Sequence, residues 1–285
     1  FYSSINSSIT NYRFPGPFFP TILYITFYSE NFTILLALIV FLTELFTLWL
    51  WVNYLKEKIN IFYLLFFVLM PFPLILGFLH SSDVFFYFFS TLIFLIMKRN
   101  ISVKNFVFFI LLFLILTIRP ASLSIIFAVF IYVIIFDNKN LKYIFISLFC
   151  LLLGVFYYQS YFFVEREIVS EITPVVNLVS QLDFNSKLLE NIFYYITKIF
   201  FLFGFHPSSS GSEFVYALRS FCGLTLLIGY IYSLKKIKNF DFFYLNLTIL
   251  PIIFFLYPAW RYIMPISPLL YLYFVNFIHL FFRKK

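Results

Sequence analysis

Tyr257-Pro258-Ala259-Trp260-Arg261-Tyr262-Ile263-Met264-Pro265-Ile266-Ser267-Pro268 places an arginine between two apolar runs, among aromatic residues and prolines. The chain on either side of this stretch is hydrophobic enough to cross a lipid bilayer. An arginine costs several kcal/mol in hydrocarbon. We therefore expect Arg261 to lie at a water-facing end of a membrane span or to line a polar cavity.

The composition of the whole chain points to a membrane protein. Hydrophobic residues make up 63% of the 285 residues and charged residues only 11%, whereas a soluble domain carries about 25% charged residues. No soluble core could bury this much apolar surface. We therefore predict an all-α, polytopic transmembrane helical bundle that forms a single domain over residues 1–285.

Apolar segments long enough to be spans or half-spans recur along the chain. They lie at about 32–52, 61–79, 84–97, 106–118, 121–136, 143–163, 219–234, 242–257 and 263–282. Several are shorter than the roughly 20 residues that cross a bilayer. Short segments can still cross if they tilt little or border a protein-lined cavity, so we predict about nine spans.

The basic residues suggest an orientation for these spans. Every second connection is rich in lysine and arginine: Lys56 and Lys58, Lys98 to Lys104, Lys139 and Lys142, Lys235 to Lys238, and Arg283 to Lys285. By the positive-inside rule these connections and the C-terminus are cytoplasmic. The net charge of +8 is then a topology signal, and no nucleic-acid partner is expected. The same rule makes 106–136 a hairpin of two helices with Arg119-Pro120 at its outer tip.

Two longer segments are expected outside the cytoplasm. Residues 1–31 are polar and then proline-rich, which suits an extracytoplasmic loop or interfacial segment. Residues 164–218 carry charges of both signs, and we expect 192–205 to form an interfacial helix that stays on the outer side. The chain begins at Phe1, so we expect further residues upstream.

This topology gathers unusual polar residues on the extracytoplasmic side. The candidate site residues are Asp83, His80, Arg119, Arg261, Tyr262, Arg13 and His206. Guanidinium groups pair bidentately with phosphate, so Arg119 and Arg261 are the candidate ligands of a lipid phosphate. Asp83 is the candidate catalytic carboxylate, which could act as a base or orient a hydroxyl.

Each of these residues also has a structural interpretation. Arg261 beside Trp260 and Tyr262 could be an interfacial anchor, and Asp83 could cap the helix that follows Ser81. Glu44 lies inside a predicted span, where a carboxylate is costly, so we expect it to be paired within the bundle. The sequence contains no metal-binding motif or nucleotide-binding loop, so no metal or other cofactor is expected.

Four stretches resemble motifs of the GT-C membrane glycosyltransferases, a superfamily that includes protein O-mannosyltransferases and bacterial lipid A aminoarabinose transferases. Phe14-Pro15-Gly16-Pro17-Phe18-Phe19-Pro20 is similar to the proline-rich end of that family's first outer loop. His80-Ser81-Ser82-Asp83 resembles its acidic helix start, and Thr117-Ile118-Arg119-Pro120 resembles its hairpin tip. Trp260 to Pro268 is similar to its late Arg-Tyr-x-x-Pro-x-x-Pro span.

The resemblance implies a fold, a reaction and a location. It implies a hexosyltransferase of the cell envelope that moves a sugar from a polyprenyl-phosphate-linked donor to a glycan, lipid or protein acceptor on the extracytoplasmic face. It places the protein among the lipids of a bacterial plasma (inner) membrane. Because no acidic residue precedes Glu30, the family's catalytic carboxylate is expected upstream of Phe1.

Three other functions remain open from the sequence. An O-antigen or polysaccharide polymerase or ligase also has many spans and a long outer loop, which here would be 164–191. A transporter or flippase for lipid-linked sugars would place polar residues along a pathway through the midplane and often shows inverted repeats. A non-catalytic membrane protein that descends from a transferase would also look like this.

Overall fold

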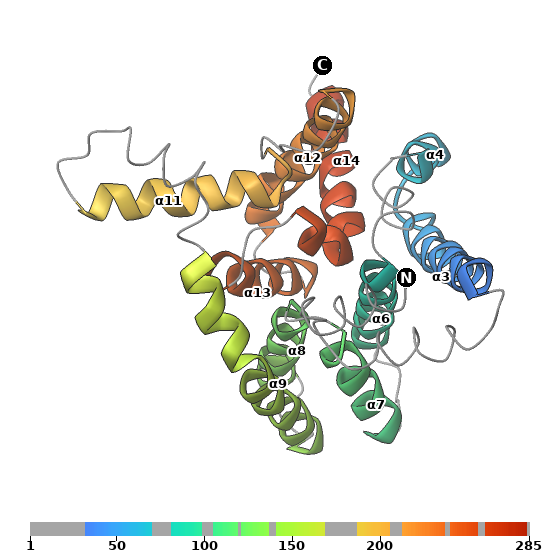
Figure 1. Cartoon of the computed structure of the whole chain (residues 1–285). Helices are drawn as coiled ribbons and strands as arrows, with labels where there is room; N and C mark the ends of the chain where they lie inside the picture. Colours follow the sequence, from blue (N-terminus) through green and yellow to red (C-terminus); the bar gives the residue numbers. More distant parts are fainter. Residues whose placement is uncertain are drawn as a thin grey trace.

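The structure, a computed structural model, describes residues 32–69, 81–98, 105–118, 121–136, 141–168, 187–205, 213–236, 240–255 and 260–283. These ranges contain helices and turns and no strand, so the all-α prediction is confirmed for them. The α-helices are α3 (Phe32–Leu55), α4 (Ile61–Leu69), α6 (Ser81–Lys98), α7 (Asn105–Leu116), α8 (Ser122–Phe136), α9 (Leu141–Ile168), α11 (Lys187–Leu202), α12 (Glu213–Ser233), α13 (Phe240–Phe255) and α14 (Ser267–Arg283). Two 3-10 helices, η2 (Leu234–Lys236) and η3 (Trp260–Ile266), complete the described part (Figure 1).

Among the described residues, two stretches are long and apolar enough to cross a membrane. They are Leu38–Leu55 in α3 and Tyr262–Phe282, which runs from η3 through α14. Shorter apolar stretches of 10–17 residues lie within α7, α8, α9, α11, α12 and α13. That these helices cross a membrane, and that the chain has about nine spans, stay predictions.

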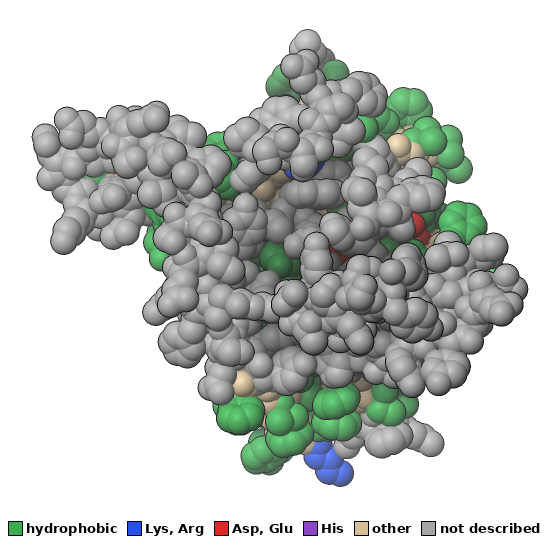
Figure 2. Space-filling model, viewed as in Figure 1, with side chains coloured by type: hydrophobic (Ala, Val, Ile, Leu, Met, Phe, Trp, Pro, Cys, Tyr) green, Lys and Arg blue, Asp and Glu red, His purple; other side chains and the backbone are tan. Residues whose placement is uncertain are grey.

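Large apolar side chains lie on the surface of the described helices as well as in their core. Large apolar side chains are exposed along the outer helices, for example Phe41, Leu42, Leu45 and Trp49 on α3, and Phe145, Phe149, Leu152 and Phe156 on α9. Figure 2 shows such side chains at the edge of the molecule. Small polar side chains are instead buried between helices, including Ser90, Ser122, Ser147 and Thr248. An apolar exterior with small polar side chains at the helix contacts suits a bundle surrounded by lipid.

Buried serine and threonine hydroxyls donate hydrogen bonds to backbone carbonyls of their own helices. Ser90 donates its hydroxyl hydrogen bond to the Phe86 carbonyl at 2.6 Å, and Thr248 donates to the Tyr244 carbonyl at 2.7 Å. This i to i−4 pattern is common for serine and threonine in helices. It lets α6 and α13 bury these serine and threonine hydroxyls at helix contacts with each donor paired.

Helices that neighbour in sequence pack together in the middle of the chain. Helices α7 and α8 are separate and in contact, as the hairpin predicts, and α9 packs on both of them. The turn that follows α7 includes a hydrogen bond from the Ile118 amide to the Ile115 carbonyl at 3.2 Å. The tip residues Arg119 and Pro120 lie outside the described residues.

The structure refines one predicted segment and corrects another. The apolar segment predicted at 263–282 matches the stretch Tyr262–Phe282, in which the α-helix begins at Ser267 because the preceding residues form η3, which contains Pro265. Proline lacks an amide hydrogen and fits best in the first turn of a helix, where Pro268 lies. Helix α9 continues to Ile168, five residues into the segment predicted to be an outer loop.

Candidate functional site

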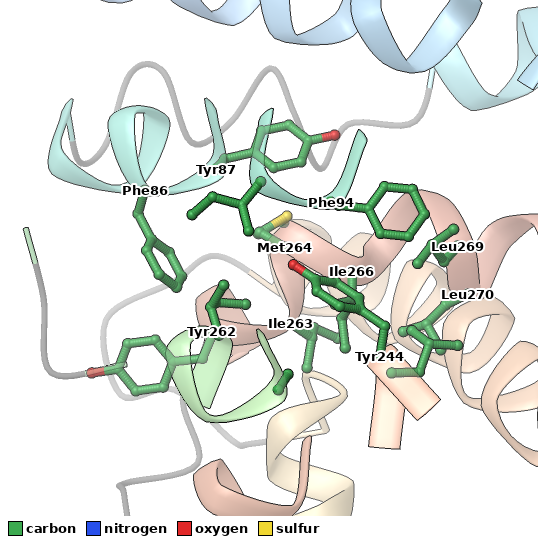
Figure 3. Packing of buried hydrophobic residues seen from close by; sticks show 14 of the residues in the cluster. Phe86, Tyr87, Phe94, Tyr244, Tyr262, Ile263, Met264, Ile266, Leu269 and Leu270 are labelled. Atoms are coloured by element: carbon green, nitrogen blue, oxygen red, sulfur yellow. The ribbon is translucent and has the colours of Figure 1, made fainter. Parts of the chain in front are cut away.

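The 3-10 helix η3 lies where several helices meet. It packs against α6, α11, α13 and α14. Ile263, Met264 and Ile266 are completely or almost completely buried in the apolar core. Figure 3 shows Phe86 of α6 pointing towards this segment and Tyr244 of α13 next to Met264. The proline-rich stretch that singles out this region in the sequence therefore forms part of the centre of the fold.

Asp83 lies in the first turn of α6, against this centre. Its side chain is 1% exposed and both carboxylate oxygens are buried. The helix begins at Ser81, so Asp83 is inside the first turn and does not occupy the N-cap position. A carboxylate in the first turn is stabilised by the positive end of the helix dipole. Its burial suits a group that orients a neighbour, and direct contact with a substrate requires a covering group to move.

Tyr262 is the second candidate residue whose side chain is described. It is 4% exposed, and in Figure 3 its hydroxyl points away from Met264 and Ile266. Since α6 and η3 are in contact, the fold brings the segments of Asp83 and Tyr262 together from distant parts of the chain.

The other predicted site residues are not tested by the structure. Arg261 belongs to η3, which fixes its position in the chain's fold, but its side chain lies outside the described residues. His80, Arg119, Arg13 and His206 also lie outside them. Their roles stay predictions.

Lys198 is a buried cation that the sequence analysis did not single out. It is 6% exposed, and its Nζ donates a hydrogen bond to the carbonyl of Ile253 at 2.9 Å. The ammonium also lies 5.1 Å from the ring centroid of Tyr194, within the range of a cation–π interaction. Ile253 is two residues from the end of α13, where carbonyls lack helical partners and a cation is favoured.

Periodicity within α11 could have pointed to this lysine. The exposed apolar residues of α11 are Leu189, Ile192, Phe193, Ile196 and Phe200, and they share one face of the helix. Lys198 lies on the other face, which contacts α13 and η3. In the sequence, a single lysine in an aromatic segment is interpreted as a solvent-exposed residue. Only the contact of Lys198 with α13 shows that it is a buried one.

Arg219 approaches the end of α11 from α12. Gly204, directly after α11, has a φ of 89°, a left-handed conformation that glycine adopts at little cost. A Cβ at this position would lie 3.0 Å from Cγ of Arg219. The turn therefore packs against the aliphatic stem of Arg219.

Replacing Lys198 with methionine is expected to lower the free energy of unfolding by about 1.5–3 kcal/mol, because a hydrogen bond from a charged donor is lost and the Ile253 carbonyl stays buried. Hydrogen exchange of α11 and thermal unfolding in detergent would measure the effect. Lys235→Met is the control, since Lys235 is exposed. Equal stability of the two variants would show that the hydrogen bond from Lys198 to α13 does not stabilise the fold.

Comparison with known proteins gives no match: no family model matches the sequence, and no curated protein or solved structure is significantly similar to the chain. The functional argument therefore depends on the residues and their geometry.

Proposed function

We propose that this chain is a polytopic membrane glycosyltransferase of the GT-C type, which transfers a sugar from a polyprenyl-phosphate-linked donor to an acceptor on the extracytoplasmic face. The observation that carries the proposal is the contact between α6 and η3. These elements contain Asp83 and Arg261, which belong to two of the four motifs that resemble the family. Motifs far apart in sequence are expected to meet if they serve one site.

The surface of the molecule supports the membrane part of this proposal. Apolar side chains face outward on α3, α9 and α11, as lipid contact requires. Figure 1 shows α11 extending away from the other helices across the view. A helix with one apolar face suits the membrane interface. We place the chain in a bacterial plasma membrane with the α6–η3 end outside the cytoplasm.

The proposed reaction is a displacement at the anomeric carbon of the donor sugar. The acceptor hydroxyl oxygen forms a bond to this carbon while the bond from the carbon to the phosphate oxygen breaks. The hydroxyl proton moves to a carboxylate, for which Asp83 is the candidate in this chain. Arg119 and Arg261 are the candidates to stabilise the departing polyprenyl phosphate.

The test is transfer from radiolabelled polyprenyl-phosphate sugars by the purified full chain in lipid nanodiscs. Arg261→Ala is expected to lower turnover about 100- to 1,000-fold, the usual cost of removing one group that stabilises developing negative charge. Arg283→Ala, at the predicted cytoplasmic end, is the control. Unaltered donor turnover in a well-folded Arg261→Ala protein would rule out the phosphate role of Arg261.

A further inference from the structure

Helices α3 and α6 form a parallel pair with a polar seam. Phe46 lies 5.9 Å from Phe88 between ring centroids, and Trp51 stacks on Phe94 at 5.3 Å. The Trp51 indole also donates a hydrogen bond to the Thr91 hydroxyl at 2.8 Å. Later residues of α3 thus meet later residues of α6, so the two helices run in the same direction.

Two buried polar groups in this seam lack hydrogen bonds. Glu44 is 6% exposed and Tyr87 is 2% exposed. The Oε1 atom of Glu44 and the hydroxyl of Tyr87 are buried and have no hydrogen-bond partner among the described residues. The pairing expected for Glu44 from the sequence is therefore not found there. Each unsatisfied group costs about 1–3 kcal/mol, so the two are candidates for satisfaction by a bound ligand.

The two groups belong to one location. The pairing of Phe46 with Phe88 and of Trp51 with Thr91 puts Glu44 level with the first turns of α6, where Tyr87 lies. Figure 3 shows Tyr87 on α6 in the part of the view nearest α3. Tyr87 follows Asp83 by four residues, so it lies on the same face of α6, about 6 Å further along the helix.

The chemistry of Glu44 and Tyr87 limits the class of ligand that can bind between them. A carboxylate repels phosphate, so the lipid phosphate itself does not fit. The described residues contain no group of three or more His, Cys, Asp or Glu side chains suited to a metal ion. One hydroxyl group satisfies both positions at once, because it donates to the Glu44 carboxylate and accepts from the Tyr87 phenol. The α3–α6 contact also contains aromatic rings, such as Phe46 and Phe88, and aromatic rings suit the apolar faces of a sugar.

We infer that Glu44 and Tyr87 bind a hydroxyl of the sugar carried by the lipid-linked donor and so contribute to the choice of sugar. This inference rests on the proposed function, to which it adds a sugar subsite one helical turn from Asp83. In this arrangement the phosphate lies with the arginines and the sugar extends into the α3–α6 seam.

Binding measurements test the subsite without requiring turnover. The full chain in nanodiscs is titrated with polyprenyl phosphate and with polyprenyl-phosphate glucose, mannose and N-acetylglucosamine, including deoxy analogues of the sugar that binds best. Glu44→Gln and Tyr87→Phe are each expected to weaken binding of that glycosylated lipid about 10- to 100-fold. Binding of the bare lipid phosphate should stay the same. The double variant should lose little more than either single variant, because both residues contact one hydroxyl.

Matched controls separate recognition from damage to the fold. Ser90→Ala removes a buried hydroxyl of α6 that is already bonded to the Phe86 carbonyl, and it should bind every lipid like the wild type. The deoxy analogue that lacks the hydroxyl bound by Glu44 should bind to the wild type and to Glu44→Gln equally weakly. The inference is overturned if Glu44→Gln and Tyr87→Phe bind the glycosylated lipid normally, or if they lose the bare lipid to the same extent.

The outcomes for the subsite and for the proposed function differ. A wild-type chain that transfers sugar, with both variants unaltered in binding, overturns the subsite alone. A wild-type chain that binds glycosylated lipid through Glu44 but transfers nothing supports the subsite and contradicts the transferase. A wild-type chain that neither binds nor transfers contradicts both.

Discussion

Replacement of Asp83 with asparagine is expected to lower the rate of sugar transfer about 100- to 10,000-fold, the usual contribution of a positioned acid or base. Asparagine keeps the volume of the buried side chain but cannot accept the proton of the acceptor hydroxyl. The loss of a favourable charge in the first turn of α6 costs about 1 kcal/mol or less. The effect on activity should therefore greatly exceed the effect on stability.

The dependence of the rate on pH distinguishes two roles for Asp83. If the carboxylate takes the proton, the residual activity of Asp83→Asn depends on pH in a different way from that of the wild type. If Asp83 only orients a neighbouring group, the maximal rate of Asp83→Asn is lower than that of the wild type. The shape of its pH profile is then the same, because another group acts as the base. Initial rates in nanodiscs between acid and neutral pH measure this.

Ser90→Ala is the control on the same helix, since Ser90 is buried two turns further along α6. It should keep full activity. Wild-type rates in a folded Asp83→Asn protein would remove Asp83 from the reaction.

Local signals in the sequence predicted the helices well. The apolar run at 84–97, preceded by two serines and an aspartate, corresponds to α6 at Ser81–Lys98. The charge pattern resolved 106–136 into two helices, and α7 and α8 are separate. These predictions succeed because length, hydrophobicity and helix-breaking residues act over a few turns of one segment.

Features that depend on distant contacts could not be predicted in this way. Burial of Lys198 requires the free carbonyl of Ile253, 55 residues later in the chain. The position of η3 at the centre of the fold depends on contacts with α6 and α11, which its prolines do not encode. The sequence predicts that burying the Glu44 carboxylate is costly. It does not predict that Tyr87 lies near Glu44, because this depends on the register of α3 against α6.

The close crossing of α12 and α14 explains why glycine occupies position 229. A Cβ on Gly229 would overlap the carbonyl oxygen of Leu270 and would lie 2.9 Å from its carbonyl carbon and 3.2 Å from the Phe274 nitrogen. All three are backbone atoms of α14, so no change of rotamer can relieve the overlap. Small residues at such crossings are typical of membrane helices, which associate by close packing.

Gly229→Ala is therefore expected to lower the free energy of unfolding by about 1–3 kcal/mol, even though alanine favours the helix by about 1 kcal/mol. Because α14 continues directly from η3, displacement of α14 should also disturb the segment that carries Arg261 and Tyr262, and donor binding should weaken together with stability. Gly154→Ala is the matched control: its Cβ would meet the ends of the Leu116 and Leu123 side chains, which can rotate away. Thermal unfolding in detergent should rank Gly229→Ala below Gly154→Ala, and the reverse order would mean that the two helices do not cross closely at Gly229.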